Sequence, residues 1–127
     1  MDSKFYVSLE AARLLREKGY DRECVAYYQH ERFHPYSVDL FKLSTYNKNA
    51  APAYMNQYSA PTKSEAIDWL DDKGIVVEVV FDCNMQRWYF SIYKEEKTPW
   101  IKHLSNDTFP TRLEAEDAVI IKALEVL

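Results

Sequence analysis

Five consecutive residues, His30-Glu31-Arg32-Phe33-His34, spell H-E-x-x-H, the pattern with which many metallopeptidases bind zinc. That chemistry needs a helix, because a spacing of four residues then brings both imidazoles to one face and to one Zn²⁺. The glutamate between them would polarise the metal-bound water, and a third protein ligand would complete the site. This stretch is therefore the first candidate for chemistry in the chain.

The surrounding residues argue against a helix at this motif. Pro35 follows it directly, and helices usually end at or before the residue that precedes a proline. The preceding run, residues 24–29, is typical of a strand. The first glutamate after the motif is Glu65, which already has a role as a helix-start residue. The sequence therefore predicts a turn between strands at residues 30–34, with no metal site and no catalytic set.

Three segments of the chain start alike, and each predicts a helix. They are SLEAARLLREKG from Ser8, TKSEAIDWLDDKG from Thr62 and TRLEAEDAVIIKALEVL from Thr111. The two threonines each stand three residues before a glutamate, which is the capping-box pattern. Gly19 and Gly74 follow the first two helices at the left-handed position typical of a helix end. These two segments also match each other at one constant offset, which suggests an internal duplication.

Strand patterns fill the gaps between these helices. Residues 75–81 and 87–93 are rich in β-branched and aromatic side chains, and the five residues between them suit a hairpin loop. Residues 23–29 and 37–45 are the equivalent pair in the first half. Residues 21–34 can also be read as a helix that begins at Asp21, and this alternative stays open.

The predicted order of elements is α-ββ-α-ββ-α, which is an α+β fold. We expect one domain over residues 1–127, with repeat-like halves at about 8–60 and 61–109 and a closing helix at 111–127. The helices would pack on one face of a mostly antiparallel, four-stranded sheet.

The second predicted hairpin carries a candidate binding surface. Side chains on a strand alternate between two faces. If the helices cover the face of Trp88, Phe90 and Ile92, the other face belongs to Glu78, Arg87, Tyr89 and Tyr93. Tyrosine and arginine are enriched where proteins bind one another. The alternative is an ordinary half-exposed sheet face, where tyrosine is common because of its β-propensity.

Composition narrows the classes of function. The formal net charge is -4 and no run of Lys or Arg occurs, so nucleic-acid binding is disfavoured. With 2 glycines and no glycine-rich motif, phosphate-cradling loops are excluded. Cys24 and Cys83 lie far apart, as free thiols of a reducing compartment do. Neither a signal peptide nor an apolar run of about 18 residues is present. We expect a cytoplasmic protein without a cofactor, a membrane or a small-molecule ligand.

Three segments resemble a group of short proteins from gut Bacteroidetes. They are KFYVSLEAARLLREKGYDREC, APTKSEAIDWLDDKGIVVEV and PTRLEAEDAVIIKALEVL. The resemblance extends over most of the chain and rests on helix starts and Trp-Leu patterns. Genes of that group often accompany phage or mobile-element genes, and the group has no assigned activity. The resemblance implies a small intracellular accessory protein.

The expected function is a non-enzymatic protein–protein interaction or dimerisation module, whose partner is another protein or a second copy of the chain. A small zinc hydrolase that uses His30, Glu31 and His34 is the first alternative. A nucleic-acid-binding accessory protein is the second.

Overall fold

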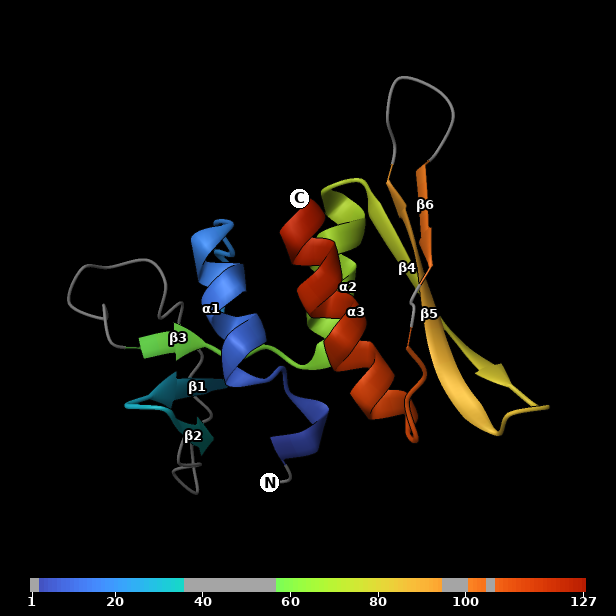
Figure 1. The fold of residues 1–127 in the computed structure, drawn as a ribbon. Helices are drawn as coiled ribbons and strands as arrows, with labels where there is room; N and C mark the ends of the chain where they lie inside the picture. Colours follow the sequence, from blue (N-terminus) through green and yellow to red (C-terminus); the bar gives the residue numbers. More distant parts are fainter. Residues whose placement is uncertain (1–2, 36–56, 95–100, 105–106) are drawn as a thin grey trace. The chain divides into compact units, whose positions relative to one another are not determined.

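The computed structural model describes residues 3–35, 57–94, 101–104 and 107–127, with the backbone alone at 101–104. The described chain is a mixed α+β protein, as predicted (Figure 1). It divides into two compact units, Met1–Thr62 and Lys63–Leu127. The division falls beside the predicted junction of the two halves, and the closing helix belongs to the second unit.

The described part of the first unit contains one α-helix and one small sheet. Its elements are a 3-10 helix at Ser3–Phe5, α1 at Leu9–Glu17, β1 at Ala26–Gln29, β2 at Arg32–Pro35 and β3 at Gln57–Ser59. The strands are antiparallel in the order β2-β1-β3. The helical alternative for residues 21–34 is therefore wrong. The predicted partner strand of β1, residues 37–45, lies outside the described residues, and β1 pairs with β2 instead.

Local sequence explains where α1 begins and what it buries. The Ser8 hydroxyl oxygen accepts a hydrogen bond from the backbone N–H of Ala11 at 3.2 Å, as an N-cap does. Ala11, Ala12 and Leu15 are fully buried on one side of the helix, as the apolar spacing predicts. The Tyr28 hydroxyl of β1 donates to the carbonyl of Val7 at 2.7 Å, which ties the strand to the start of the helix.

Within residues 63–94, 101–104 and 107–127, the second unit contains two helices and a longer sheet. Its elements are α2 at Lys63–Asp72, β4 at Ile75–Asp82, β5 at Arg87–Lys94, β6 at Ile101–Leu104 and α3 at Arg112–Val126. The strands are antiparallel in the order β4-β5-β6. The predicted second hairpin is confirmed almost residue for residue, whereas the sequence did not predict β6.

Both helices of the second unit pack against the same sheet. Ile75 and Ile92 are fully buried and lie on one face with Phe90, as the strand pairing requires. At the far end of the sheet, Lys94 Nζ donates to the carbonyl of Val126 at 2.8 Å. A cation at that position also interacts favourably with the negative end of the α3 dipole.

A buried lysine joins the starts of α2 and α3. Lys63 is only 7% exposed, and its Nζ donates to the carbonyl of Leu113 at 2.9 Å. Burial lowers the pKa of this ammonium group, and the carboxylates of Asp117, Glu116 and Glu114 act in the opposite direction. The hydrogen bond and these carboxylates offset the cost of burying the charge.

The described strands do not form the single four-stranded sheet that the sequence predicts. They make two sheets of three strands each, one in each unit. The strand order also differs between the two sheets. β1, the first strand of its unit, is central in one sheet, whereas β5, the second strand of its unit, is central in the other. The internal duplication that the sequence suggested is not confirmed, although in each unit a helix is followed by a glycine and a hairpin. Hydrophobic periodicity identifies strands but does not say which of them become neighbours.

The glycines after α1 and α2 adopt the conformation that the sequence predicts. Gly19 has φ +90° and Gly74 has φ +83°, and an added Cβ would meet no atom within 4 Å at either position. We expect Gly19→Ala and Gly74→Ala each to cost about 1 kcal/mol of unfolding free energy, for backbone reasons alone. Urea unfolding measures this, with Lys18→Ala and Lys73→Ala as neighbouring controls. Alanine variants as stable as the wild type would contradict the left-handed assignment.

Candidate functional site

The H-E-x-x-H stretch forms the tip of the β1–β2 hairpin. His30 and Glu31 alone join the two strands, with φ angles of 51° and 65°. His34 lies on β2, where its ring stacks on Tyr27 with the ring centroids 5.2 Å apart. His30 lies in the turn and His34 lies on the strand that follows it, so no helix places the two histidines one turn apart. The predicted turn between strands is confirmed for residues 30 and 31 only, because residues 32–34 belong to β2, and the two imidazoles do not share a helical face.

Metal-ligating side chains do not gather elsewhere in the described parts of the chain either. Within those residues, no group of three or more His, Cys, Asp or Glu could hold a metal ion. The helix-start residue Glu65, the first candidate for a third ligand, belongs to the second unit. Residues 30–34 therefore do not have the geometry that the zinc motif requires.

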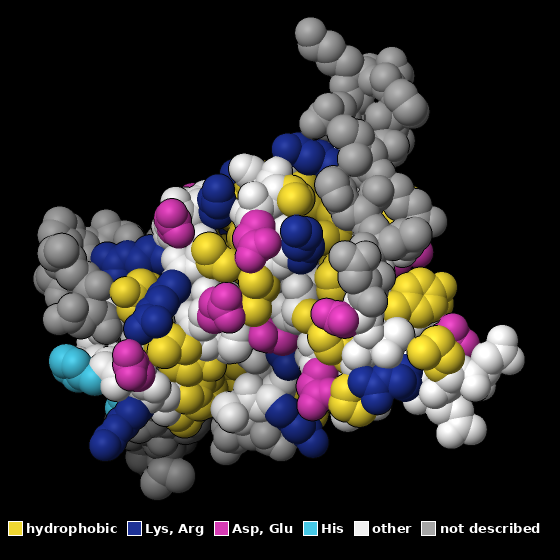
Figure 2. All heavy atoms as spheres, viewed as in Figure 1, with side chains coloured by type: hydrophobic (Ala, Val, Ile, Leu, Met, Phe, Trp, Pro, Cys, Tyr) yellow, Lys and Arg dark blue, Asp and Glu magenta, His cyan; other side chains and the backbone are white. Residues whose placement is uncertain are grey.

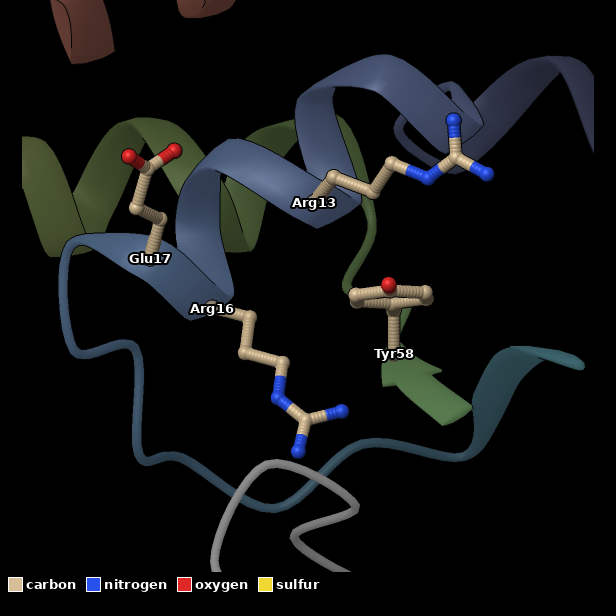
Figure 3. A pocket seen from close by; sticks show the side chains of 4 residues that line it. All are labelled: Arg13, Arg16, Glu17 and Tyr58. Atoms are coloured by element: carbon tan, nitrogen blue, oxygen red, sulfur yellow. The ribbon is translucent and has the colours of Figure 1, made fainter. Parts of the chain in front are cut away.

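A shallow pocket of about 500 Å³ lies between α1 and β3 in the first unit (Figure 3). It is lined by Arg13, Arg16, Glu17 and Tyr58. The guanidinium carbons of Arg13 and Arg16 lie 5.8 Å and 5.4 Å from the centre of the Tyr58 ring. Figure 3 shows that they approach the ring from its two sides. The two cations therefore do not converge on one anion.

The polar groups of this pocket have structural roles. Arg16 Nη1 donates to the carbonyl of Gln57 at 2.6 Å, which ties α1 to β3. Arg13 Nη2 lies 3.4 Å from a carboxylate oxygen of Glu31 at the hairpin turn, and both side chains are exposed. Cation–π contacts of this kind contribute about 0.5–1 kcal/mol at exposed sites. The pocket is best explained as the place where the helix docks on its sheet.

The four residues predicted for binding do lie on one face of the second sheet. The pairing sets Arg87, Tyr89 and Tyr93 of β5 opposite Asp82, Val80 and Val76 of β4, and Glu78 opposite Ser91. Residues directly opposite in a sheet point to the same side. This side is the reverse of the one that carries Phe90 and Ile92. The arrangement of the four residues thus follows the predicted alternation.

Arg87 nevertheless has a different role from its neighbours. Its Nε donates to the Thr108 hydroxyl at 2.7 Å, and its Nη2 donates to the Thr108 carbonyl at 2.9 Å. The next residue, Trp88, exchanges two backbone hydrogen bonds with Phe109, at 2.8 Å and 2.7 Å. Arg87 therefore holds the segment that leads into α3. Thr108 therefore occupies these two donors, which the sequence analysis had assigned to a contact with a partner.

The edge of this sheet is a feature that the sequence reasoning missed. In the described part of the chain, β4 pairs with β5 on one side only. Alternate residues of an edge strand direct their N–H and C=O groups away from the sheet. Between Ile75 and Phe81, Glu78 is the single charged residue, and no proline or lysine protects the edge. The apolar run was visible in the sequence, but its position at an edge was not.

Hydrophobic side chains also reach the surface at this hairpin. Val76 is 37% exposed, Phe81 is 46% exposed and Met85 in the loop is 57% exposed. The rings of Phe81 and Trp88 lie 5.1 Å apart. Figure 2 shows hydrophobic side chains at the surface of this part of the second unit, and in Figure 1 the end of the hairpin extends past α3. Exposed apolar surface beside an open edge is typical of a site of association.

The fold and this surface define a class of protein, namely a small α+β protein with an apolar sheet edge that the described residues leave unpaired. Comparisons with protein-family models, with curated proteins and with solved structures found no match. In the described residues, no helix has the length and apolar character needed to cross a membrane. The function must therefore be argued from the surface itself.

Proposed function

We propose that this chain is a non-enzymatic protein-interaction module that binds its partner through the edge of β4. The observation that carries the proposal is the strand itself, eight residues long, apolar except for Glu78 and Asp82, and unpaired on its outer side by the described residues. An extended segment of a partner would add a strand there. Its backbone would then satisfy the outward N–H and C=O groups of β4.

Side chains on both faces would add specificity to this backbone pairing. Glu78 lies on the outer face of the edge strand β4, with Tyr89 and Tyr93 on the same face of the central strand β5, and Val79 and Phe81 of β4 lie on the other face. An added strand places alternate side chains against each of these sets. Tyrosine contributes strongly to protein interfaces because its ring is large, rigid and amphipathic. In this proposal Arg87 supports the surface through Thr108 and does not contact the partner.

The sequence-based expectations complete the proposal. The resemblance to the Bacteroidetes group, whose genes often accompany mobile elements, supports an accessory role, and Cys24 and Cys83, which form no disulfide, fit the cytoplasm. The zinc hydrolase has no supporting geometry, since His30 and Glu31 form a hairpin turn and His34 lies on the strand β2. A nucleic-acid-binding role is not supported by a net charge of -4.

The proposal is tested by selecting peptides from a displayed random library on the full-length protein. We expect bound peptides to be extended and to change the backbone amide chemical shifts of residues 75–82 most. Methylation of alternate peptide nitrogens on the pairing edge should abolish binding, and methylation on the opposite edge should preserve it. A selection that yields no binder, or binders that shift only other residues, would contradict the proposal.

A further inference from the structure

We infer that the segment that pairs with β4 is a basic, extended stretch of a partner protein. Its lysine or arginine side chains would lie on one face, and its other face would be apolar. This inference rests on the proposed function and names the chemistry of its partner. β4 carries two charged side chains, Glu78 and Asp82, and both are negative. Because side chains alternate along a strand, both lie on the outer face of the sheet.

Glu78 is the carboxylate that most favours a cation on the added strand. Its neighbour directly opposite on β5 is the neutral Ser91, and Val76 and Val80 flank it on the same face. Within the described residues, no hydrogen bond or ion pair occupies this carboxylate. A cation directly opposite Glu78 would form a stabilising cross-strand pair, whereas an anion there would be destabilising.

Asp82 adds a second preference of the same sign. It lies opposite Arg87, whose Nε and Nη2 donate to Thr108 and not to the Asp82 carboxylate. Asp82 Oδ1 accepts from the backbone N–H groups of Asn84 at 2.9 Å and Met85 at 3.2 Å. These neutral donors do not cancel the negative charge, so a second cation on the added strand is favourable here too.

The helix beside the edge strand is also acidic. α2 packs against β4, whereas α3 packs against both β4 and β5, so α2 lies on the β4 side of this sheet. The ammonium group of Lys63 is buried, and that of Lys73 lies 5.3 Å from the centre of the Trp69 ring. The exposed face of α2 carries four carboxylates, those of Glu65, Asp68, Asp71 and Asp72. A cationic segment is therefore attracted to this side of the second unit.

The helix-covered face of β4 favours apolar side chains. Phe90 and Ile92 of β5 are buried, but Val79 and Val77, directly opposite on β4, are only half-buried. Phe81 on the same face is 46% exposed. The cover over this face thus becomes thinner toward the edge. Apolar side chains on an added strand would lie against these residues and remove them from water.

Blocked synthetic peptides test the inference on the full-length protein. KVTVKVT carries its lysines on one face at the spacing of Glu78 and Asp82, and EVTVEVT carries anions at the same positions. Backbone amide shifts of residues 75–82 report the binding. We expect the Kd of the lysine peptide to be about tenfold lower at low salt, and the difference to shrink at high salt. KVTKVVT has the same composition but places its lysines on opposite faces, and it should bind about threefold more weakly than KVTVKVT.

A matched pair of variants separates the edge from the overall charge of the chain. Glu78→Lys should raise the Kd of KVTVKVT about tenfold and lower that of EVTVEVT. Glu125→Lys makes the same change in net charge on α3, at an exposed carboxylate that lies 3.8 Å from the Lys122 ammonium. This control should leave the ratio of the two Kd values unchanged. A ratio that both variants change equally would overturn the inference.

The outcomes distinguish this inference from the proposed function. Equal Kd values for the lysine and glutamate peptides, with both shifting the amides of β4, would overturn the basic partner and leave the proposed function intact. Shifts of the β4 amides that grow with protein concentration alone would identify a second copy as the occupant, with the same consequence. Failure of both peptides to bind would also overturn the inference, and the library selection then decides the proposed function. A lysine peptide that shifts only residues outside β4 would contradict both.

Discussion

Replacement of Arg87 by methionine will lower the free energy of unfolding of the second unit by about 2 kcal/mol. Both guanidinium nitrogens that contact Thr108 would be lost, and the hydroxyl and carbonyl of that residue would lose their donor. The aliphatic part of the side chain is retained, so the effect reports the hydrogen bonds. The segment before α3 would still be held by the backbone pairing of Trp88 with Phe109 and by the stacked rings of Phe90 and Phe109.

Urea unfolding followed by tryptophan fluorescence measures this effect, because all 3 tryptophans lie in the second unit. Glu78→Gln, on the same face of the sheet, serves as the control and should change stability by no more than about 0.5 kcal/mol. This measurement separates the two roles considered for Arg87, which are to hold Thr108 within the folded unit and to contact a partner. An Arg87→Met variant that keeps wild-type stability and loses peptide binding would restore Arg87 to the binding surface.

The double replacement His30→Asn/Glu31→Gly will stabilise the β1–β2 hairpin by about 2 kcal/mol. The two-residue turn has positive φ at both positions, which is the type I′ geometry. Asn-Gly is the preferred pair in this turn, whereas a side chain such as that of Glu31 is strained there. The exposed contact of Glu31 with Arg13 would be lost, but such pairs contribute little.

Hydrogen exchange of the backbone amides in β1 and β2 measures this change, since the first unit contains no tryptophan. Glu31→Gln alone leaves the turn strained and should leave the exchange rates close to wild type. The same proteins address the zinc alternative through metal analysis of chelator-free preparations. Stoichiometric zinc in the wild type that the double variant loses would show that the strained turn is kept for metal binding.

Much of the local structure follows from residues close together in the chain. Ser8 begins α1 and Thr111 begins α3, because each hydroxyl oxygen accepts from an amide three residues later. Gly19 and Gly74 follow their helices with positive φ. The alternation in β4 and β5 correctly separates a buried face from the face of Tyr89 and Tyr93. All of these depend on spacings of one to four residues, which can be read directly from the sequence.

Pro35 shows both the strength and the limit of such reasoning. Its position correctly predicted that no helix extends through residues 30–34, which form a turn and the start of a strand. The proline itself ends β2, so the strand uses residues that the sequence analysis assigned to a turn. The tight His30–Glu31 turn was not expected, because neither residue type favours positive φ as glycine does.

The sequence by itself determined the three helices, the second hairpin and the faces of its strands, because each depends on interactions within a few residues. Only the tertiary structure decided that the strands divide into two sheets, that β4 lies at an edge and that Arg87 binds Thr108. These features depend on which distant segments meet when the chain folds. Periodicity describes one segment at a time, so it can show that a strand is apolar but not whether its edge is open.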